Sequence, residues 1–366
     1  MTLLALTAGA CVQARDAYPF DGDAWRIEGD ARVETSTDGA ALHVVNGAAY
    51  LDDAGFRDGT IEFDVFTSGD RAFVYLMFRG QSEEAYEDLY FRPHKSGLPD
   101  AVQYAPVFQR RSAWQLYHGA RGTAAAAFPA GRWTRVRFEV AGAAATVWVG
   151  EGSEPALTVA SLGRDAASGW LAVRGFVPRN SKTAYAAKFR NFRVTHRDAA
   201  PAAAGRSEPL PDGQLTAWRV SPAFDAPPGP ILELPEAVDG AEWSTPPMQP
   251  GGVFEFLRSR RVPDGSRHWA VAAETTLRAD AATTCTLRLG YSDEITLSVN
   301  GEPVAYQDSS YRFDAPRQDG VMHDDQLVVF LHLKRGANPL RAVVADRFGG
   351  WGFSARMDAC EGVAEL

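Results

Sequence analysis

Several features that define whole classes of protein are missing from this sequence. No block of lysine and arginine is longer than two residues, and the formal net charge of the chain is -9 at pH 7. A nucleic-acid-binding protein carries a basic patch or stripe that neutralises phosphates. We therefore exclude DNA and RNA as partners, whereas neutral or cationic partners remain open.

Signatures of metal and cofactor chemistry are also missing. The seven histidines lie at positions 43, 94, 118, 196, 268, 323 and 332, so no two of them have the i, i+4 spacing of a helical metal site. The chain has no glycine-rich phosphate loop, no G-x-S-x-G turn and no dinucleotide fingerprint. The sequence therefore predicts no cofactor.

Long apolar runs are absent too, and the run at the N-terminus is short. Residues 1–14, MTLLALTAGACVQA, carry no charge, and small residues precede Arg15 as they do at signal-peptidase sites. A membrane span needs ~20 apolar residues, so this run is too short to be one. We expect a signal peptide over residues 1–14 and export to the periplasm or the extracellular space, although its usual basic start is missing. Lipid attachment at Cys11 is the less favoured alternative.

Cysteine is scarce, with only three residues in the chain. Loss of Cys11 with the signal peptide would leave Cys285 and Cys360, an even pair in one expected domain. An exported protein can bridge such a pair. Two unrelated buried thiols would give the same pattern, because cysteine is among the most buried residue types. The sequence leaves both interpretations open.

Helical periodicity is absent, and short alternating segments take its place. In WTRVRFEV, residues 133–140, Val136, Phe138 and Val140 alternate with charged residues, so one strand face packs inward and the other meets water. Segments of this kind, rich in β-branched and aromatic residues, recur between Gly, Pro and Asp turns. In the second half, Asn300-Gly301 predicts a tight hairpin turn.

The length and the spacing of these segments predict two domains. A chain of 366 residues exceeds one ordinary core of roughly 100–200 residues. We expect an all-β protein of two β-sandwich (jelly-roll) domains over residues 18–196 and 216–366. Residues 197–215, rich in Ala, Pro and Gly, are expected to form the linker.

The first domain resembles the concanavalin A-like lectin/glucanase and laminin-G-type modules. FRDGTIEFDVF, FVYLMFR, AGRWTRVRFEVAGAAATVWV and AKFRNFRV stand where such modules carry their strands. The second domain resembles the galactose-binding-like jelly rolls of bacterial secreted glycosidases, through LRLGYSDEITLSVNGEPV and LVVFLHLKRGANPLRAVV. Both resemblances imply work on carbohydrate at or outside the cell surface. Neither identifies the saccharide, and fold alone does not decide function.

Two carboxylates lie on one face of an expected strand. Glu62 and Asp64 are two residues apart, which places their Cβ atoms ~6–7 Å from each other. A retaining glycosidase needs two carboxyl groups about 5 Å apart. The glucanases of the resembled family have a third acidic residue four positions further on, where this chain has Ser68. We therefore favour a solvated pair on a polar strand face.

The densest group of planar polar and aromatic side chains follows in residues 90–104, YFRPHKSGLPDAVQY, and in residues 112–119, SAWQLYHG. Saccharides are recognised by aromatic rings that cover their C–H surfaces and by planar groups that bond their hydroxyls. We expect these two segments to form one ligand-binding surface with carbohydrate as partner. Its residues are Arg92, His94, Gln103, Tyr104, Trp114, Gln115, Tyr117 and His118.

Two alternatives stay open for these residues. A polysaccharide-cleaving enzyme could use Glu62 and Asp64 as a hydrolase pair, or His94 or Tyr104 as the base of a lyase. Alternatively, the polar residues brace a hairpin. A further acidic group, Glu83, Glu84, Glu87 and Asp88, could hold structural calcium. Its ligand spacing is irregular, so we expect a solvated loop and no metal site.

Overall fold

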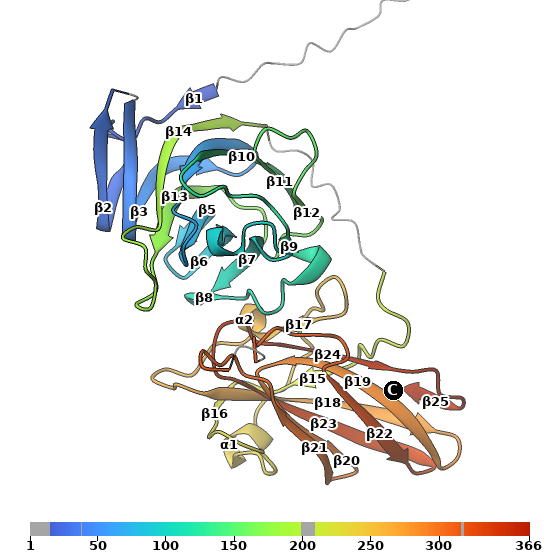
Figure 1. Cartoon of the computed structure of the whole chain (residues 1–366). Helices are drawn as coiled ribbons and strands as arrows, with labels where there is room; N and C mark the ends of the chain where they lie inside the picture. Colours follow the sequence, from blue (N-terminus) through green and yellow to red (C-terminus); the bar gives the residue numbers. More distant parts are fainter. Residues whose placement is uncertain (1–14, 38, 199–208, 316–317) are drawn as a thin grey trace, which may run out of the picture. The chain divides into compact units, whose positions relative to one another are not determined.

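The computed structural model of the chain describes residues 15–37, 39–198, 209–315 and 318–366 (Figure 1). The expected signal peptide, residues 1–14, and residues 199–208 of the expected linker lie outside these ranges. Regular structure in the described ranges is almost entirely β-strand, as the sequence predicts. The described α-helices, α1 (Glu236–Asp239) and α2 (Phe256–Ser259), are single turns, and no described helix is long and apolar enough to cross a membrane.

The chain forms two compact units that are discontinuous in sequence. Among the described residues, the first comprises residues 15–81, Tyr90–Val102 and residues 124–198, and the second comprises Ser82–Leu89, Gln103–Thr123 and residues 209–366. Two segments of the second unit therefore come from residues 18–196, the range expected for the first sandwich. The expected domains, by contrast, are continuous.

The first unit contains the strands β1 (Arg15–Ala17), β2 (Arg26–Ser36), β3 (Gly39–Phe56), β4 (Gly59–Phe66), β5 (Phe73–Ser82), β10 (Trp133–Ala141), β11 (Ala144–Val149), β12 (Leu157–Val159), β13 (Gly169–Phe176) and β14 (Ala187–His196), and the short helix η1 (Pro93–Lys95). Four strands have residues in both units: β5, whose last residue, Ser82, lies in the second unit, β6 (Ala85–Phe91), β7 (Val102–Phe108) and β9 (Thr123–Ala124).

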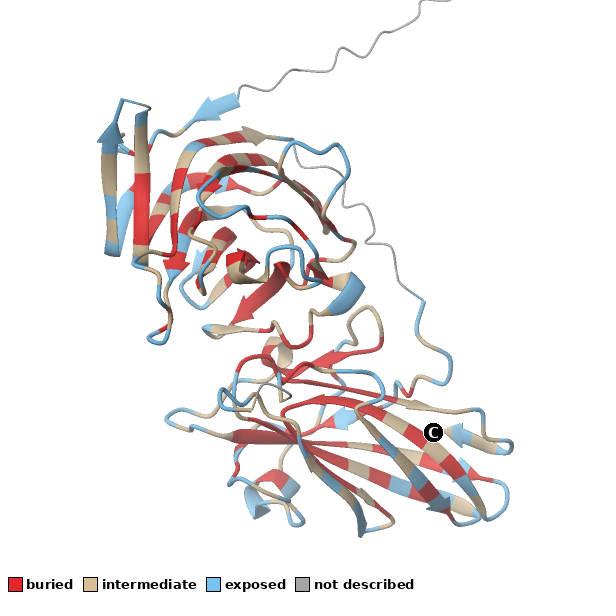
Figure 2. Ribbon diagram, in the orientation of Figure 1, coloured by how far each residue is buried: buried red, intermediate tan, exposed pale blue. Residues whose placement is uncertain are grey.

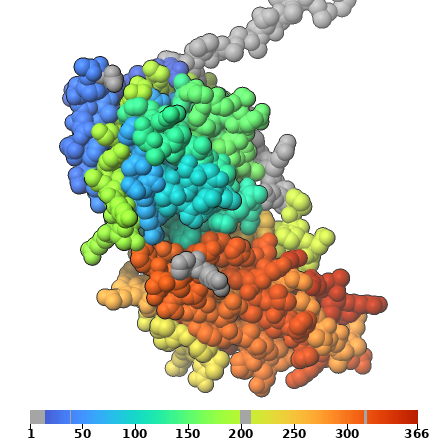
Figure 3. All heavy atoms as spheres, viewed as in Figure 1, coloured from blue at the N-terminus to red at the C-terminus, as the bar shows by residue number. Residues whose placement is uncertain are grey.

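The strands of the first unit pair antiparallel and curl into two facing layers. Their order is β12-β11-β10-β4-β14-β3-β13-β5, with β1 beside β14 and β2 beside β3. Phe78 of β5 and Phe138 of β10 stand far apart in this order, yet their ring centroids are 4.8 Å apart. The sheet therefore folds back on itself, and its core lies between the layers (Figure 1). Segments that are distant in sequence are also neighbours at the surface. The blue atoms of the N-terminal strands lie beside yellow-green atoms of the segment that ends in β14 (Figure 3), because β3 pairs with β14.

The two layers are amphipathic because side chains alternate across each strand. In β4, Ile61, Phe63 and Val65 are buried, whereas Glu62 and Asp64 between them are partly exposed. This alternation is visible as bands of red and tan or pale blue along the strands (Figure 2). Each layer therefore has an inner apolar face and an outer polar one, as the sequence predicts.

The second unit contains the strands β8 (Arg111–Ser112), β15 (Arg219–Val220), β16 (Phe224–Asp225), β17 (Phe254–Glu255), β18 (Trp269–Ala279), β19 (Thr283–Ser292), β20 (Glu294–Val299), β21 (Glu302–Asp308), β22 (Leu327–Leu333), β23 (Gly336–Asp346), β24 (Gly352–Met357) and β25 (Val363–Glu365), the helices α1 and α2, and the short helix η2 (Gly119–Arg121).

Two antiparallel sheets make up most of the second unit. One has the order β15-β18-β23-β20-β21, with β16 and β25 also paired to β18, and the other has the order β17-β24-β19-β22. Their shared core contains three fully buried indoles, Trp218, Trp269 and Trp351. The unit is therefore a β-sandwich of its own, as expected.

The hairpin and the cysteine pair of the second unit can now be placed. Asn300 and Gly301 have φ angles of 53° and 82° and connect β20 to β21, so the predicted tight turn is confirmed. Cys285 and Cys360, 75 residues apart in sequence, form a disulfide. The structure thereby decides between the two interpretations that the sequence leaves open.

Residues 103–123 pack into the second unit through side-chain bonds to its backbone. The Gln109 amide donates to the carbonyls of Leu257 and Arg260 at 2.9 and 2.7 Å and accepts from the Val262 N–H at 3.0 Å. Arg121 donates to the carbonyl of Pro250 at 2.9 Å. These bonds explain why the segment does not belong to the first unit.

Candidate functional site

The predicted ligand-binding residues are divided between the two units. Arg92 and His94 belong to the first unit. The other six belong to the second unit, and they are Gln103, Tyr104, Trp114, Gln115, Tyr117 and His118. That all eight form one surface stays a prediction.

The two predicted glutamines are buried and bonded to backbone. The Gln103 amide donates to the carbonyls of Trp114 and Tyr117 at 2.7 and 2.8 Å. The Gln115 amide donates to the carbonyl of Phe348 and accepts from a backbone N–H of the same loop. Both side chains are fully buried, so these amides hold loops together where the sequence predicts contact with a ligand.

The two predicted tyrosines each donate to a glutamate. The hydroxyl of Tyr104, which is fully buried, donates to Glu87, and that of Tyr117 donates to Glu255 at 3.0 Å. Burial and then the charge of Glu255 raise the pKa of Tyr117 well above its usual range. A lyase base must be accessible to the substrate and must have a pKa near the operating pH. Tyr104 is fully buried and bonded to Glu87, and the pKa of Tyr117 is raised well above its usual range.

Trp114 and His118 are half-buried and stand beside aromatic side chains of the second unit. The ring of Trp114 lies edge-on to Tyr311 at 6.0 Å, and the ring of His118 lies 6.1 Å from His323. Their role in ligand binding stays a prediction.

The expected hydrolase pair is held by arginines. The two carboxylate oxygens of Glu62 contact Arg15 and Arg135. Asp64 accepts from Arg190 at 3.2 Å and from Asn191 at 2.7 Å. A glycosidase acid must present a proton to the leaving oxygen, and its partner must present a free lone pair. These ion pairs fit the solvated polar strand face that we favour from the sequence.

Another surface of the first unit gathers aromatic rings and a guanidinium, which are groups that can contact a sugar. The sheet register pairs Ala172 of β13 with Tyr50 of β3, and Arg174 of β13 with Tyr75 of β5. The register shifts between Trp170 and Ala172, but the ring of Trp170 contacts that of Tyr50 and so lies on the same side. The rings and the guanidinium therefore share the outer face of one layer. We call Tyr50, Tyr75, Tyr90, Trp170 and Arg174 the aromatic–arginine face.

Neighbouring groups of the aromatic–arginine face contact one another. The rings of Tyr50 and Trp170 are edge-on with centroids 5.5 Å apart, and those of Tyr75 and Tyr90 are also 5.5 Å apart. The guanidinium carbon of Arg174 lies 5.3 Å from the centroid of Tyr75, within the range of a cation–π contact.

Two further contacts fix the ends of this row. A Cβ at Gly80 would come within 2.0 Å of the Trp170 indole, so only glycine lets the indole lie against strand β5. At Tyr50 the guanidinium of Arg26 stacks 4.4 Å from the ring centroid. The aromatic rings are therefore held in place before any ligand arrives.

Arg174 is an exposed cation without a protein acceptor. Within the described part of the chain it makes no hydrogen bond and no ion pair besides its stack on Tyr75. On the outer face of the other layer, Arg137 also stacks on an indole, Trp148, at 4.1 Å, but it donates to Glu139 at 3.1 Å. The donors of Arg174 are thus available to a ligand, whereas those of Arg137 are engaged.

Arg92, predicted from the sequence, adjoins the aromatic–arginine face. Its guanidinium carbon lies 5.3 Å from the ring centroid of Tyr90. The same guanidinium forms an ion pair with Asp100 at 3.3 Å, and Lys95 contacts that carboxylate at 2.7 Å. Part of its charge is therefore neutralised within the protein.

His94 lies near Arg92 with its ring 5.6 Å from that of Phe73. Burial, and then the positive charges of Arg71, Arg92 and Lys95, lower the pKa of His94 to about 4. The imidazole is therefore neutral at pH 7, and ligand contacts that it makes will not change between pH 6 and 8.

The face formed by Tyr50, Tyr75, Trp170 and Arg174 is what sequence reasoning missed. The signal exists in GWLAVRGF, residues 169–176, where Trp170 and Arg174 alternate with Leu171 and Val173. Tyr75 lies in a strand, FVYLMFRG, in which both faces are apolar. Nothing in that pattern distinguishes the outer face from the core.

The acidic group of Glu83, Glu84, Glu87 and Asp88 does not form a recognisable metal site in the described residues. Among the described residues, no three His, Cys, Asp or Glu side chains are grouped as metal ligands. Within the loop, Glu83 forms an ion pair with Arg110 at 2.6 Å, and Glu87 accepts from Tyr104. Structural calcium at this loop stays an untested possibility.

A different acidic pair, in the second unit, is buried. Asp293 and Asp346 are both fully buried. Desolvation raises the pKa of both carboxyl groups, and for Asp346 the charge of Asp293 adds to the rise. Asp293 accepts from the N–H groups of Arg347 and Phe348, both at 2.7 Å, which holds it as the charged partner. A proton on Asp346 then removes the repulsion between the two carboxyl groups.

This pair predicts a loss of stability as pH rises. A carboxyl group whose pKa is raised by folding binds its proton more tightly in the native state, so its stabilisation is present at low pH. For Asp346 it is lost as pH rises above 3.8, the ordinary value of an aspartate, through the raised pKa of that carboxyl group. We expect Asp346→Asn, which mimics the protonated acid, to flatten this fall in a pH series of thermal unfolding. The exposed Asp325→Asn is the control, and identical slopes for wild type and Asp346→Asn would contradict the assignment.

Comparisons with known proteins give likenesses of fold. No family model matches the chain, and no curated protein matches it. Among solved structures, a carbohydrate-binding module from Bacillus subtilis is 12% identical with a TM-score of 0.33 and covers 46% of this chain and 91% of its own. A Bacillus subtilis protein of unknown function with a galectin-like fold is 13% identical with a TM-score of 0.38, over 51% of this chain and 96% of its own. A β-glucanase from Bacillus licheniformis is 10% identical with a TM-score of 0.39, over 50% of this chain and 98% of its own.

Proposed function

We propose that this chain is an exported carbohydrate-binding protein that holds a saccharide against the aromatic–arginine face. The observation that carries the proposal is Arg174, an exposed guanidinium stacked 5.3 Å above the ring of Tyr75 and without an acceptor in the described chain. A free donor fork beside aromatic rings is the combination that a sugar ring needs.

The chemistry of each group supports this assignment. Rings such as Tyr50 and Trp170 offer flat apolar surface for the C–H groups of a sugar, and Arg174 offers N–H donors for its hydroxyl oxygens. The face stands on a sheet whose strands are fixed by hydrogen bonds, so little conformational entropy is lost on binding. Predicted residues Arg92 and His94 extend the face with a guanidinium and a neutral imidazole.

Export is supported by the disulfide between Cys285 and Cys360. Disulfides persist in oxidising compartments and are rare in the cytosol. The bridge therefore fits the periplasmic or extracellular location that residues 1–14 predict. A saccharide partner at or outside the cell surface fits the same location.

Catalysis is not part of the proposal. The carboxylates of Glu62 and Asp64 are held by Arg15, Arg135 and Arg190. The phenol of Tyr104 is buried against Glu87. Release of reducing ends, or of unsaturated products, from polysaccharide by the purified chain would restore the enzymatic alternative.

Arg174→Ala and Tyr75→Ala are expected to weaken saccharide binding about tenfold or more each. A hydrogen bond to a charged group contributes about 1.5–3 kcal/mol, and loss of an aromatic ring removes comparable apolar contact. The measurement is affinity electrophoresis in gels that contain laminarin, xylan, levan or galactan. Arg137→Ala is the matched control, because it removes the same stacked cation from the other layer. Equal retardation of Arg174→Ala and wild type, or equal loss in the control, would refute the proposal.

A further inference from the structure

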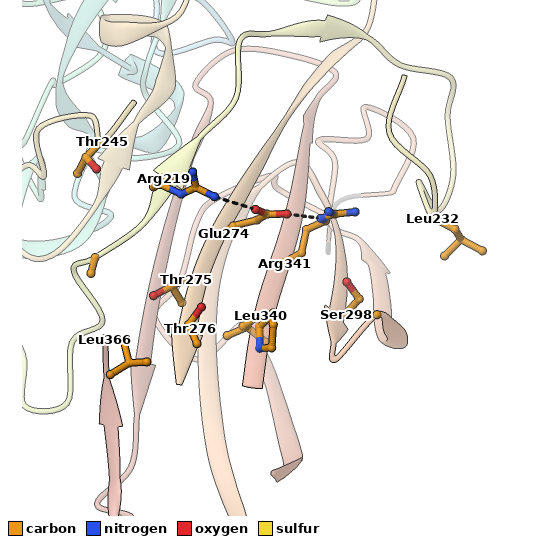
Figure 4. A pocket seen from close by; sticks show the side chains of 13 residues that line it. Arg219, Leu232, Thr245, Glu274, Thr275, Thr276, Ser298, Leu340, Arg341 and Leu366 are labelled. Atoms are coloured by element: carbon orange, nitrogen blue, oxygen red, sulfur yellow. Dashed lines mark hydrogen bonds and ion pairs between the residues drawn. The ribbon is translucent and has the colours of Figure 1, made fainter. Parts of the chain in front are cut away.

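The second unit has a pocket that neither the predicted residues nor the proposed function uses. It has a volume of ≈ 440 Å³ and lies over the outer face of the sheet β15-β18-β23-β20 (Figure 4). Such a volume falls within the range of small-ligand sites, roughly 300–1,000 Å³. It is therefore large enough for one or two sugar rings.

One cross-strand row forms the polar floor of this pocket. The register pairs Arg219 of β15 with Glu274 of β18, Glu274 with Arg341 of β23, and Arg341 with Ser298 of β20. Neighbouring strands lie ~4.8 Å apart, so the four side chains span ~14 Å. Thr276, two residues after Glu274 on the same face, adds a hydroxyl. We call Arg219, Glu274, Thr276, Ser298 and Arg341 the polar row.

The polar row alternates donors and acceptors. Arg341 donates to one oxygen of Glu274 at 2.7 Å, and Arg219 donates to the other at 3.5 Å (Figure 4). Their side chains are 37%, 65% and 26% exposed for Arg341, Arg219 and Glu274, so solvent reaches all three. Each guanidinium uses one donor here and keeps others, and each carboxylate oxygen keeps a lone pair.

The hydroxyls of Ser298 and Thr276 have no hydrogen-bond partner within the described residues, although both line the pocket. Together with the remaining donors of the arginines, they form a set of polar atoms that a ligand can satisfy. The exposed Leu232 and Leu366 supply apolar surface beside them.

An apolar segment covers part of the outer face of this sheet, and the pocket lies where that segment ends. The neighbouring row of the same face, Ala272, Val343 and Thr296, lies under an apolar segment. The Ile231 N–H of that segment donates to Thr296 at 3.0 Å, and its next residue, Leu232, is already 62% exposed at the pocket. The polar row is thus the first one that the cover leaves open.

We propose that this pocket is a second binding site and that it takes a neutral saccharide. A sugar hydroxyl both donates and accepts, so neighbouring hydroxyls can bond to the Glu274 carboxylate and an arginine at once. The leucines then meet the C–H faces of the ring. An anionic ligand would have to approach Glu274 on a chain of net charge -9. Two sites on one chain would raise its retention on a polysaccharide through avidity.

The test uses the full chain with both Arg174→Ala and Tyr75→Ala, which together weaken the binding proposed for the first unit. Laminarin, xylan, levan and galactan are titrated by calorimetry, with alginate as the anionic probe. We expect residual binding of at least one neutral polysaccharide, and about tenfold weaker binding after Glu274→Gln or Ser298→Ala. Ser298→Ala breaks no bond within the described chain, so it should leave the unfolding midpoint unchanged.

Thr276→Val removes another hydroxyl of the polar row and should also weaken this binding. Thr286→Val, on the outer face of the other sheet of this unit, is its control. The proposal would be overturned if no residual binding is found or if alginate binds better than the neutral polysaccharides. It would also be overturned if Glu274→Gln and Ser298→Ala leave the residual binding unchanged. The two proposed sites fail separately. If Arg174→Ala and Tyr75→Ala leave binding intact and Glu274→Gln abolishes it, the first-unit site is wrong and this one stands.

Discussion

Reduction of the Cys285–Cys360 disulfide is expected to lower the free energy of unfolding of the second unit by about 4 kcal/mol. The bridge joins residues 75 apart in sequence, so it removes a large loop from the unfolded ensemble. Cys285 lies in strand β19 within the core, and Cys360 follows β24, the neighbour of β19 in the sheet. The bridge therefore holds the end of the chain against the sheet.

The measurement is hydrogen exchange resolved by peptide, with and without reductant. Peptides from β18, β19 and β23 should exchange faster after reduction, whereas those from β10 and β13 of the first unit should not change. The double variant Cys285→Ala/Cys360→Ala is the control, because reductant should have no further effect on it. Unchanged protection of β19 in the reduced protein would contradict the prediction.

Arg79→Met is expected to destabilise the first unit by about 3–5 kcal/mol, the usual cost of breaking a buried ion pair on one side. Arg79 is 2% exposed and donates to Asp58 at 2.9 Å and to the carbonyls of Arg57 and Gly142 at 2.6 and 2.7 Å. Asp58 is 1% exposed and also accepts from the Gly142 N–H at 2.7 Å. Methionine has similar length but leaves that buried carboxylate with only the partly exposed Arg57, at 3.7 Å, as a nearby cation.

Denaturant unfolding of the single and double variants measures this cost. Arg79→Met/Asp58→Asn should recover much of the lost stability, because no uncompensated charge is then buried. Arg26→Ala is the matched control. Arg26 pairs with Asp52 at the surface, so its loss should cost less than about 1 kcal/mol. A change of similar size for Arg79→Met and Arg26→Ala would show that the buried pair has no special role.

Local patterns allowed much of the fold to be predicted. The alternation of Ile61, Phe63 and Val65 with Glu62 and Asp64 predicts a half-buried strand, and the structure has β4 there. The Asn300-Gly301 turn follows from the φ angles that this dipeptide tolerates. The assignment of residues 103–123 to the second unit could not be predicted, because bonds such as that from Gln109 to Leu257 join residues 148 apart.

The candidate sites were harder to predict for the same reason. Gln103 and Gln115 stand in a polar, aromatic segment, but the sequence does not reveal that backbone carbonyls engage both amides. Tyr75 and Arg174 meet only because β5 pairs with β13. Arg219, Glu274 and Arg341 lie in three separate segments of the chain and form one row through sheet register alone.

The most direct test of the proposed function follows the indole N–H signals of the tryptophans by NMR. The ligand is an oligosaccharide of whichever polysaccharide retards the chain. Trp170 belongs to the aromatic–arginine face, whereas Trp148 stacks with Arg137 on the other layer. We predict that the signal of Trp170 shifts in a saturable way and that the signal of Trp148 does not. A shift of Trp148 with Trp170 unchanged would contradict the proposal that this face binds the saccharide.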